Sequence, residues 1–416
     1  MILYLNNYKG FTDTFIPIRD VNFLVGENST GKSTVLSVLE MISNTHFWTY
    51  AELSTTEFKL GPFREIVNQF SQDKTFFQIG IESDYLKTNG ATAQYSFLGT
   101  YREYDGNIVL DSMKYTCEGN TIYCSSIHGK QMTIAKRHKS YMSFKEWIHS
   151  EIPHRKKIVD SPYDSYVFLP EMMKYIQDKL NIRNNVYQHF FVLGFSQFTS
   201  FSPIRAEAHR IYETFSNSYS PQGSHIPIVI NRLMHSKGSE NKEIVQNLYN
   251  FGKDSDLFDS ITTVGFGNSS DSPFMISVNY GNVKVNLTNV GYGVSQSLPL
   301  VVELLKSRRK TLSLQQPEVH LHPKAQAAFG DLLYDSATKC QNTFFCETHS
   351  DFIINRFRYA LNKGAQKVSA QVLFFTRDGK GTHVIQMPID SFGRFENVPA
   401  DYTRFFIDEE LKMLEF

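Results

Sequence analysis

Gly26-Glu27-Asn28-Ser29-Thr30-Gly31-Lys32-Ser33-Thr34 is the most informative segment of this 416-residue chain. It matches the pattern G-x-x-x-x-G-K-[ST], which forms a phosphate-binding loop between a strand and a helix. An apolar run at 21–25 leads into it, and residues 33–42 place apolar side chains at helical spacing without an internal Gly or Pro. The sequence therefore predicts a strand, a phosphate-binding loop and a helix, in that order.

The residue types of this loop suit the phosphates of a nucleoside triphosphate. Glycines permit a backbone turn whose amides face an anion, and the helix start adds positive potential. Lys32 is expected to reach the outer phosphates, and Ser33 to offer its hydroxyl to Mg²⁺. The residues predicted to contact the nucleotide here are Gly26, Asn28, Ser29, Thr30, Gly31, Lys32, Ser33 and Thr34.

Composition excludes several function classes. Lys plus Arg total 42 and Asp plus Glu total 42, so net charge favours neither nucleic acid nor an anionic membrane. The four cysteines show neither CxxC spacing nor metal-ligand His pairs, which predicts reduced thiols without a zinc site or a disulfide framework. No export signal and no run of about 18 apolar residues is visible, so we expect a cytoplasmic protein without membrane insertion.

Periodicity divides the chain into three parts and predicts an α/β fold. Residues 1–128 combine the phosphate-binding loop with short alternating runs typical of an antiparallel sheet. Residues 129–260 show helical periodicity and more charge, which predicts a mainly helical insertion. Residues 261–416 alternate strand-like and helix-like segments, which predicts a mainly parallel sheet.

Three later segments carry a family resemblance. Residues 311–323, TLSLQQPEVHLHP, resemble the second phosphate-site strand of ABC-type ATPases of the overcoming-lysogenization-defect (OLD), RecF and SMC kind, and PExHLHP fits the OLD-like branch without a gap. Residues 289–296, NVGYGVSQ, resemble the family's signature segment, and residues 344–350, FFCETHS, resemble the strand that ends in its switch histidine. Together with the phosphate-binding loop, these motifs occur in the family's order.

The resemblance implies an ATPase head that binds ATP and Mg²⁺ as a homodimer. Two chains would sandwich two ATP molecules, with the signature residues Gly291, Gly293 and Ser295 capping the partner subunit's ATP. His349 would sense the terminal phosphate. The residues implied at the catalytic positions are Gln315, Gln316, Glu318 and His349, with Ser33 and Gln315 as the Mg²⁺ positions.

Gln315 departs from the family pattern, which usually places Glu or Asp at this strand end. A glutamine keeps the shape of a glutamate but neither carries the charge that Mg²⁺ prefers nor accepts a proton. Slow hydrolysis is therefore expected of this chain. Natural loss of hydrolysis and a Glu-to-Gln substitution that traps bound ATP both fit. The intact remainder of the phosphate site favours the second, and Glu318 is the nearest remaining carboxylate.

The resemblance also extends to function. OLD-like ATPases without a nuclease domain are similar to the sensor ATPase subunits of the Septu and PARIS antiphage systems, which implies a separate nuclease effector as partner. A DNA-repair ATPase that clamps nucleic acid directly is the alternative, supported by the basic runs at 136–139 and 154–157. A non-hydrolysing ATP-dependent scaffold is the third reading.

Two further segments match the OLD-like branch, and neither has an evident role. Residues 202–212 fit its PxRxxxxRxY stretch, where Arg205 and Arg210 would contact phosphate or a partner, or pair with carboxylates. Residues 390–399 resemble its C-terminal tail. Lys9 and Phe11 are candidates for adenine contact by position alone.

Overall fold

The computed structural model describes most of the chain, which folds into two compact units. The described residues are 1–51, 53, 60–86, 92–117, 119–138, 142–152, 155–161, 168–182, 198–213, 218–267 and 272–406, without the side chains of 85, 86 and 138. The first unit comprises Met1–Ile18, Glu27–Phe195 and Phe375–Gln386. The second comprises Arg19–Gly26, Ser196–Phe374 and Met387–Phe416. Each unit is therefore assembled from separate stretches of sequence.

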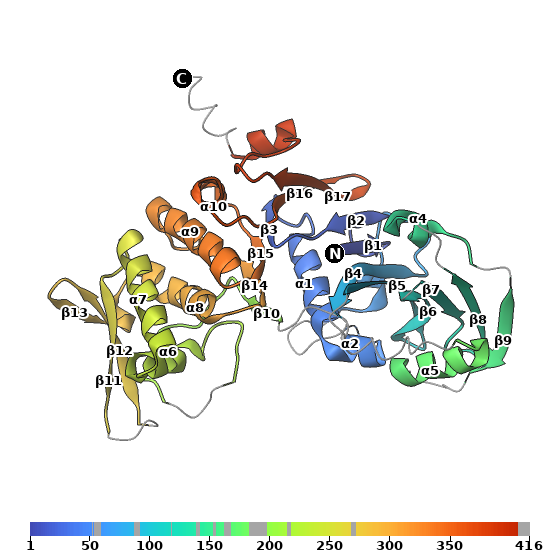
Figure 1. The fold of residues 1–416 in the computed structure, drawn as a ribbon, viewed down its shortest axis with the longest axis horizontal. Helices are drawn as coiled ribbons and strands as arrows, with labels where there is room; N and C mark the ends of the chain where they lie inside the picture. Colours follow the sequence, from blue (N-terminus) through green and yellow to red (C-terminus); the bar gives the residue numbers. More distant parts are fainter. Residues whose placement is uncertain are drawn as a thin grey trace. The chain divides into compact units, whose positions relative to one another are not determined.

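The first unit is built on an eight-stranded antiparallel sheet with the order β2-β1-β4-β5-β6-β7-β8-β9 (Figure 1). Its strands are β1 (Ile2–Asn6), β2 (Thr14–Pro17), β4 (Phe77–Leu86), β5 (Thr92–Tyr104), β6 (Asn107–Cys117), β7 (Asn120–Ser125), β8 (Gln131–His138) and β9 (Lys156–Asp160). Its helices are α1 (Lys32–Ser43), α2 (Thr45–Tyr50), α3 (Phe63–Ile66), α4 (Phe144–His149) and α5 (Leu169–Leu180). This sheet confirms the expected antiparallel region.

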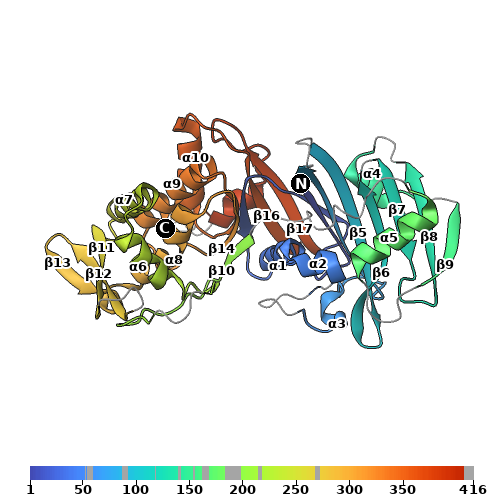
Figure 2. The same cartoon turned by 60° about the horizontal axis from the view of Figure 1, so that its bottom comes forward.

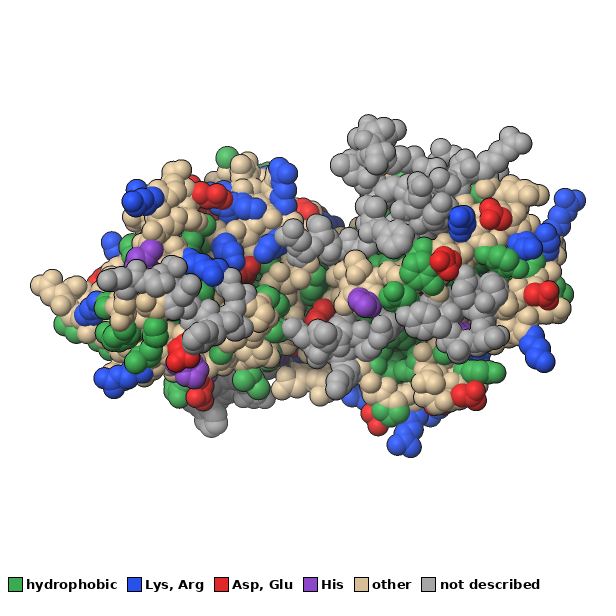
Figure 3. Space-filling model, turned by 90° about the horizontal axis from the view of Figure 1, so that it is seen from below, with side chains coloured by type: hydrophobic (Ala, Val, Ile, Leu, Met, Phe, Trp, Pro, Cys, Tyr) green, Lys and Arg blue, Asp and Glu red, His purple; other side chains and the backbone are tan. Residues whose placement is uncertain are grey.

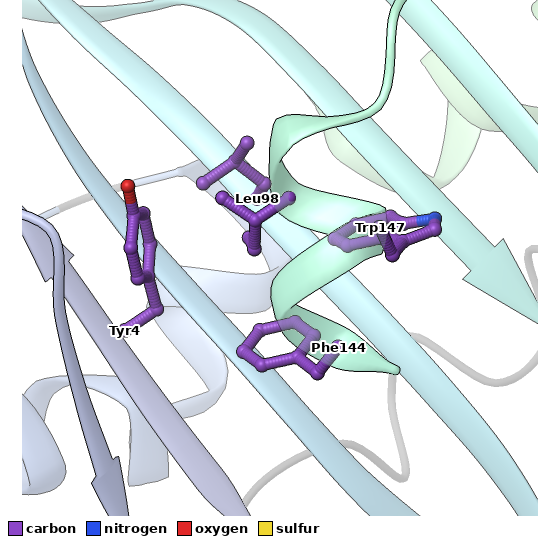
Figure 4. Close-up of a cluster of buried hydrophobic side chains, with 5 residues drawn as sticks. Tyr4, Leu98, Phe144 and Trp147 are labelled. Atoms are coloured by element: carbon purple, nitrogen blue, oxygen red, sulfur yellow. The ribbon is translucent and has the colours of Figure 1, made fainter. Parts of the chain in front are cut away.

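An aromatic cluster fixes α4 on the sheet of the first unit. Figure 4 shows Phe144 and Trp147 of α4 facing Tyr4 of β1 and Leu98 of β5, and all four side chains are buried. The helix begins with a capping box in which Ser143 accepts from the Glu146 N–H and Glu146 accepts from the Ser143 N–H. Burial of aromatic rings of this size stabilises such a contact by several kcal/mol, of the order of 2–3 kcal/mol per side chain.

The second unit contains a mainly parallel sheet with the order β10-β14-β15-β3-β16-β17. Its strands are β3 (Val21–Gly26), β10 (Phe198–Phe201), β14 (Thr311–Gln315), β15 (Thr343–Glu347), β16 (Ala370–Asp378) and β17 (Gly381–Ile389), of which parts of β16 and β17 belong to the first unit. Strands β10, β14, β15 and β3 pair in parallel. The expected α/β fold with a mainly parallel core sheet is confirmed.

Strand β3 is buried along its whole length, as a central parallel strand requires. Its one polar side chain, Asn22, is fully buried, and both its nitrogen and its oxygen form hydrogen bonds. The Asn22 amide donates to the carbonyl oxygens of Arg19 and Phe344, and its Oδ1 accepts from Gln371. These bonds satisfy a polar residue in the core and tie β3 to its neighbours.

Helices cover this sheet, and a small antiparallel sheet adjoins them. The helices are α6 (Ile226–His235), α7 (Ser239–Asp254), α8 (Tyr292–Lys306), α9 (Pro323–Lys339) and α10 (Asp351–Lys363), and α9 packs against α10 (Figure 2). The small sheet has the order β11-β12-β13, from β11 (Ser260–Gly265), β12 (Phe274–Tyr280) and β13 (Val283–Asn286), followed by the short 3-10 helix η2 (Leu287–Asn289).

Residues 129–260 are less uniformly helical than their periodicity predicts. Alongside α4, α5, α6 and α7, their described part contains strands β8, β9 and β10. Over residues 131–134 of β8, the buried Met132 and Ile134 alternate with the more exposed Gln131 and Thr133, which is the period of a strand. Strands β8 and β9 extend the antiparallel sheet, whereas β10 joins the parallel one. The domain boundaries at 128 and 260 remain predictions.

The described surface carries mixed charge. On the face drawn in Figure 3, acidic and basic side chains are interspersed. Among the described helices, none is both long enough and apolar enough to cross a membrane.

Candidate functional site

The phosphate-binding loop follows β3 and turns through two left-handed residues. Ser29 has φ 63° and Gly31 has φ 101°, a region that glycine enters at little cost. A Cβ added to Gly31 would lie 2.7 Å from Cζ of Phe11, so the close approach also requires glycine. Phe11 is fully buried beneath the loop. Its ring therefore supports Gly31 and is not presented to adenine.

Helix α1 begins at Lys32; its N-cap residue Gly31 has no side chain to cap it, and no acidic residue lies in its first turn. The Lys32 ammonium is buried and donates to the Glu27 carbonyl at 2.7 Å, and the Thr30 hydroxyl donates to the same carbonyl at 2.8 Å. A positively charged side chain and a helix start thus converge on one loop. These residues fit a phosphate group.

The second unit brings the ends of β14 and β15 side by side. Gln315 and Glu347 are partners in the parallel register, and the N–H of Gln316 donates to the Glu347 carbonyl at 2.8 Å. Gln316 adopts a left-handed φ of 45°, which turns the chain sharply after β14. Glu347 is a nearly buried carboxylate that sequence reasoning did not single out. Its position directly before Thr348 and His349 is the sequence feature that could have identified it.

Glu318 links the turn after β14 to the switch segment. Its Oε1 accepts from the backbone N–H of His349 at 2.7 Å, and its Oε2 accepts from the Thr348 hydroxyl at 2.8 Å. Thr348 in turn accepts from the N–H of Ser350 and donates its own N–H to the carbonyl of Leu24. Both carboxylate oxygens of Glu318 therefore hold the predicted switch histidine in place.

The HLHP residues fold the next turn and start α9. Nδ1 of His322 accepts from the N–H of Ala325, and Pro323 occupies the first helical turn, where its missing N–H costs nothing. His320 has a left-handed φ of 66°, and its ring lies 5.4 Å from that of Tyr292. Residues 320–323 therefore have a role in local folding that does not depend on the family resemblance.

The predicted signature residues lie beside this turn. A Cβ on Gly293 would lie 2.9 Å from the carbonyl oxygen of His320, so glycine permits the contact between α8 and the turn. A Cβ added to Gly291 would meet nothing within 4 Å, and both Gly291 and Tyr292 are exposed. Ser295 donates only weakly, to the Tyr292 carbonyl at 3.4 Å. The N-cap residue of α8, Gly291, has no side chain to cap the first N–H groups of the helix.

Arg205 contacts the turn after β14. Its Nη2 donates to the carbonyls of Gln315 at 3.1 Å and Gln316 at 3.2 Å, in place of the carboxylate pair that the sequence left open. Arg210 is exposed. The contacts of Arg205 span 110 positions in sequence, so periodicity and spacing gave no sign of them.

The C-terminal tail turns back onto α10. Gly393 has φ 72°, its carbonyl accepts from Nε of Arg358, and the guanidinium of Arg358 lies 3.8 Å from the centre of the Phe395 ring. Beyond the tail, Phe405 lies 6.1 Å from the His349 ring, centre to centre. The segment that follows the tail therefore carries an aromatic side chain to the predicted switch histidine.

The basic runs are partly used inside the first unit. Lys136 donates to the carbonyl of Leu180 and Lys157 to that of Lys179 at 3.0 Å, so both lysines satisfy the C-terminal end of α5. The side chain of His138, and residues Lys139 and His154, lie outside the described residues.

Oxygen donors are available for Mg²⁺ within each unit. Ser33 lies in the first unit and Gln315 in the second, and both offer the oxygen ligands that Mg²⁺ prefers. A neutral amide at Gln315 fits the ion less well than a carboxylate. In the part of the chain that the structure describes, no three His, Cys, Asp or Glu side chains group together as a metal site.

A phosphate-binding loop between a buried parallel strand and a helix defines the class of P-loop nucleotide-binding proteins. The family model of the AAA ATPase domain (AAA_15) matches residues 1–354, and the chain belongs to this family of ATP-binding ATPases.

Solved structures give a weaker likeness. An SMC head bound to the C-winged helix domain of ScpA is 11% identical, with 94% of this chain and 97% of that chain covered and a TM-score of 0.49. The SMC head domain from Thermotoga maritima is 13% identical, over 94% and 98%, with a TM-score of 0.43. An SMC head with an extended coiled coil, bound to the C-terminal domain of ScpA derived from Pyrococcus furiosus, is 11% identical, over 100% and 98%, with a TM-score of 0.42. No curated protein matches the chain significantly.

Proposed function

We propose that this chain is an ATP-driven switch that closes as a homodimer and serves as the sensor ATPase subunit of a bacterial antiphage system. In this proposal the closed dimer holds a separate nuclease effector and releases it when ATP is hydrolysed. Membership of the AAA ATPase domain family supports the ATPase part. The motif resemblance to Septu and PARIS subunits supports the defence part.

The observation that carries the proposal is the connection through Glu318. This side chain joins the turn after β14 to the N–H of His349, while Gly293 seats the start of α8 against His320 in the same turn. The segments proposed to sense the terminal phosphate and to cap the partner's ATP thus share one support. A ligand that favours one arrangement of this support shifts both segments together.

Each predicted residue then has a distinct task. Lys32 and the open start of α1 would bind the phosphates of ATP, and Ser33 would offer its hydroxyl to Mg²⁺. When bound, Mg²⁺ would offset phosphate charge. The open start of α8, with the exposed Gly291, suits a phosphate group of the nucleotide bound by a second copy of the chain.

The DNA-clamping alternative is less well supported. Its evidence was the two basic runs, and Lys136 and Lys157 donate to carbonyl groups at the end of α5. A lysine engaged in this way is a poorer contact for DNA phosphates than one on a solvated face. The non-hydrolysing scaffold differs from the proposal only in turnover, which measurement decides.

An infection assay tests the proposal. Plaque counts would be compared on cells that carry the genomic segment encoding this chain, with and without Lys32→Ala, which removes the phosphate-binding ammonium. The proposal predicts that the parent segment lowers plaque counts at least about a hundredfold and that Lys32→Ala abolishes the effect, since nucleotide binding drives the switch. Unchanged plaque counts, together with tight salt-dependent DNA binding by the purified chain, would favour the alternative.

A further inference from the structure

Arg205 is a buried arginine with an unusual set of partners. Only 4% of the residue is exposed, and its one hydrogen-bonding nitrogen, Nη2, serves two backbone carbonyls at the end of β14. Nε and Nη1 are buried without a hydrogen-bond partner among the described residues. Burial lowers the pKa of Arg205 to about 10, and the nearby charge of Glu318 acts in the opposite direction. Burying a guanidinium with two unpaired nitrogens costs free energy, so its presence here indicates a specific structural or functional role.

The backbone that carries Arg205 also contacts the signature helix. The carbonyl of Ala206, the next residue, accepts from Nε2 of the buried Gln296 in α8 at 3.5 Å. The N–H of Ala206 donates to the Gln222 carbonyl at 2.8 Å. Beneath the segment lies a small cavity of about 70 Å³ that Ala206, His209 and Ser295 help to line. Adjacent residues thus contact the turn after β14 on one side and α8 on the other.

The far end of the same stretch is fixed in place. Tyr212 and Phe274 exchange two backbone hydrogen bonds, at 2.8 and 3.0 Å, and their rings stack with centres 5.7 Å apart. The stretch is therefore anchored on β12 at its far end.

We propose that residues 202–212 form a coupling segment that ties the turn after β14 to the start of α8, with Arg205 as its positioning residue. The inference deepens the proposed function, on which it rests, by naming the path between the nucleotide-sensing turn and the signature helix. Arg205 touches no reacting atom in this account. It fixes the carbonyls of Gln315 and Gln316, and Ala206 passes the position of that turn to Gln296.

Hydrogen exchange of the full chain tests the coupling segment. We would follow amides at 315–320 and at 292–298 in the parent, Arg205→Gln and Arg205→Lys. Loss of the charged donor is expected to raise exchange in both regions roughly tenfold or more, as local opening becomes easier. Arg205→Lys is expected to recover part of the protection, because its ammonium still donates to one carbonyl. Faster exchange confined to 315–320 in Arg205→Gln would overturn the proposal.

Two variants serve as control and second test. Arg210→Gln, an exposed arginine in the same segment, should leave both regions within about twofold of the parent. Gln296→Leu removes the contact from the α8 end and should raise exchange at 315–320. This variant also tests the coupling segment if Arg205→Gln does not fold. Unchanged exchange there would contradict coupling. Because this readout requires neither turnover nor dimerisation, it can succeed or fail independently of the proposed function.

Discussion

The carboxylate of Glu318 accepts a hydrogen bond of 2.7 Å from the backbone N–H of His349. The bond connects two strand ends, because Glu318 follows β14 and His349 follows β15. A second bond of 2.8 Å from the Thr348 hydroxyl fixes the other carboxylate oxygen. Glu318 is thus a support of the switch segment, and any role toward an attacking water remains a prediction.

Removal of this support should destabilise the second unit. Glu318→Ala leaves the His349 N–H and the Thr348 hydroxyl without their acceptor, at a cost of about 1–3 kcal/mol in the free energy of unfolding. Thr348→Val removes one of the two bonds to Glu318 and also the acceptor of the Ser350 N–H, so it should likewise cost about 1–3 kcal/mol. Urea unfolding of the two variants and the parent measures both values. Equal stability of Glu318→Ala and the parent would show that the bonds do not support the fold.

The two signature glycines should respond differently to alanine. Gly293→Ala places a Cβ 2.9 Å from the His320 carbonyl, so backbone must move, and we expect a loss of about 1–3 kcal/mol in unfolding free energy. Gly291→Ala meets nothing within 4 Å at an ordinary negative φ, so its stability should change by less than about 0.5 kcal/mol. Gly291→Ala should nevertheless weaken ATP-dependent dimerisation in light scattering, if α8 caps the partner's ATP. Normal dimerisation by this folded variant would contradict the capping role.

A buried carboxylate on α8 predicts a pH dependence of stability. Burial raises the pKa of Glu303, but the His225 side chain and the charges of Lys306 and Lys310 outweigh it and lower the pKa to about 2. The unfolded chain therefore takes up this proton first, so the stabilisation is complete above about pH 4.5 and is lost as the pH falls toward 2.

Glu303→Gln isolates this effect. The difference in unfolding free energy between the parent and Glu303→Gln should be larger at pH 6 than at pH 2, by up to about 3 kcal/mol. The reason is that the glutamine cannot titrate. Chemical denaturation at several pH values between 6 and 2 measures this difference between the two proteins. A gap that is constant over this range would show that Glu303 does not titrate as described.

The capping lysines should matter for stability more than for DNA. Lys136→Gln removes a charged donor from the end of α5, and we expect a loss of about 0.5–1.5 kcal/mol, with little change in the salt dependence of DNA binding. Thermal unfolding and DNA titrations at two salt concentrations test the pair of expectations. A salt slope that falls by about one for this single substitution would support direct phosphate contact.

Local patterns were enough to predict the strand, loop and helix at the start of the chain. The apolar run of β3, the glycines of the loop and the helical spacing of α1 are short-range signals, and each formed as predicted. Strands β8 and β9 were missed because their charged residues resemble an exposed helix in composition. Their pairing with distant strands, which no local pattern reveals, decided their structure.

The candidate site shows the same limit. The segments around Gln315, Gly293 and His349 were identified from the sequence, but not the contacts between them. Glu318 and Arg205 act through hydrogen bonds to residues 30 to 110 positions away, and most of these bonds involve backbone atoms. Backbone partners leave no trace in residue type, so only the fold shows them.

Steady-state ATP hydrolysis should be measured for this chain and for Gln315→Glu, with Mg²⁺ and with dimerisation followed in the same samples. An ATP-driven switch that carries Gln315 should bind ATP and dimerise but turn over slowly. Gln315→Glu should hydrolyse ATP at least about tenfold faster, because a carboxylate at the end of β14 restores the charge that Mg²⁺ prefers. If neither protein hydrolyses ATP nor dimerises with it, the ATP-driven switch is contradicted.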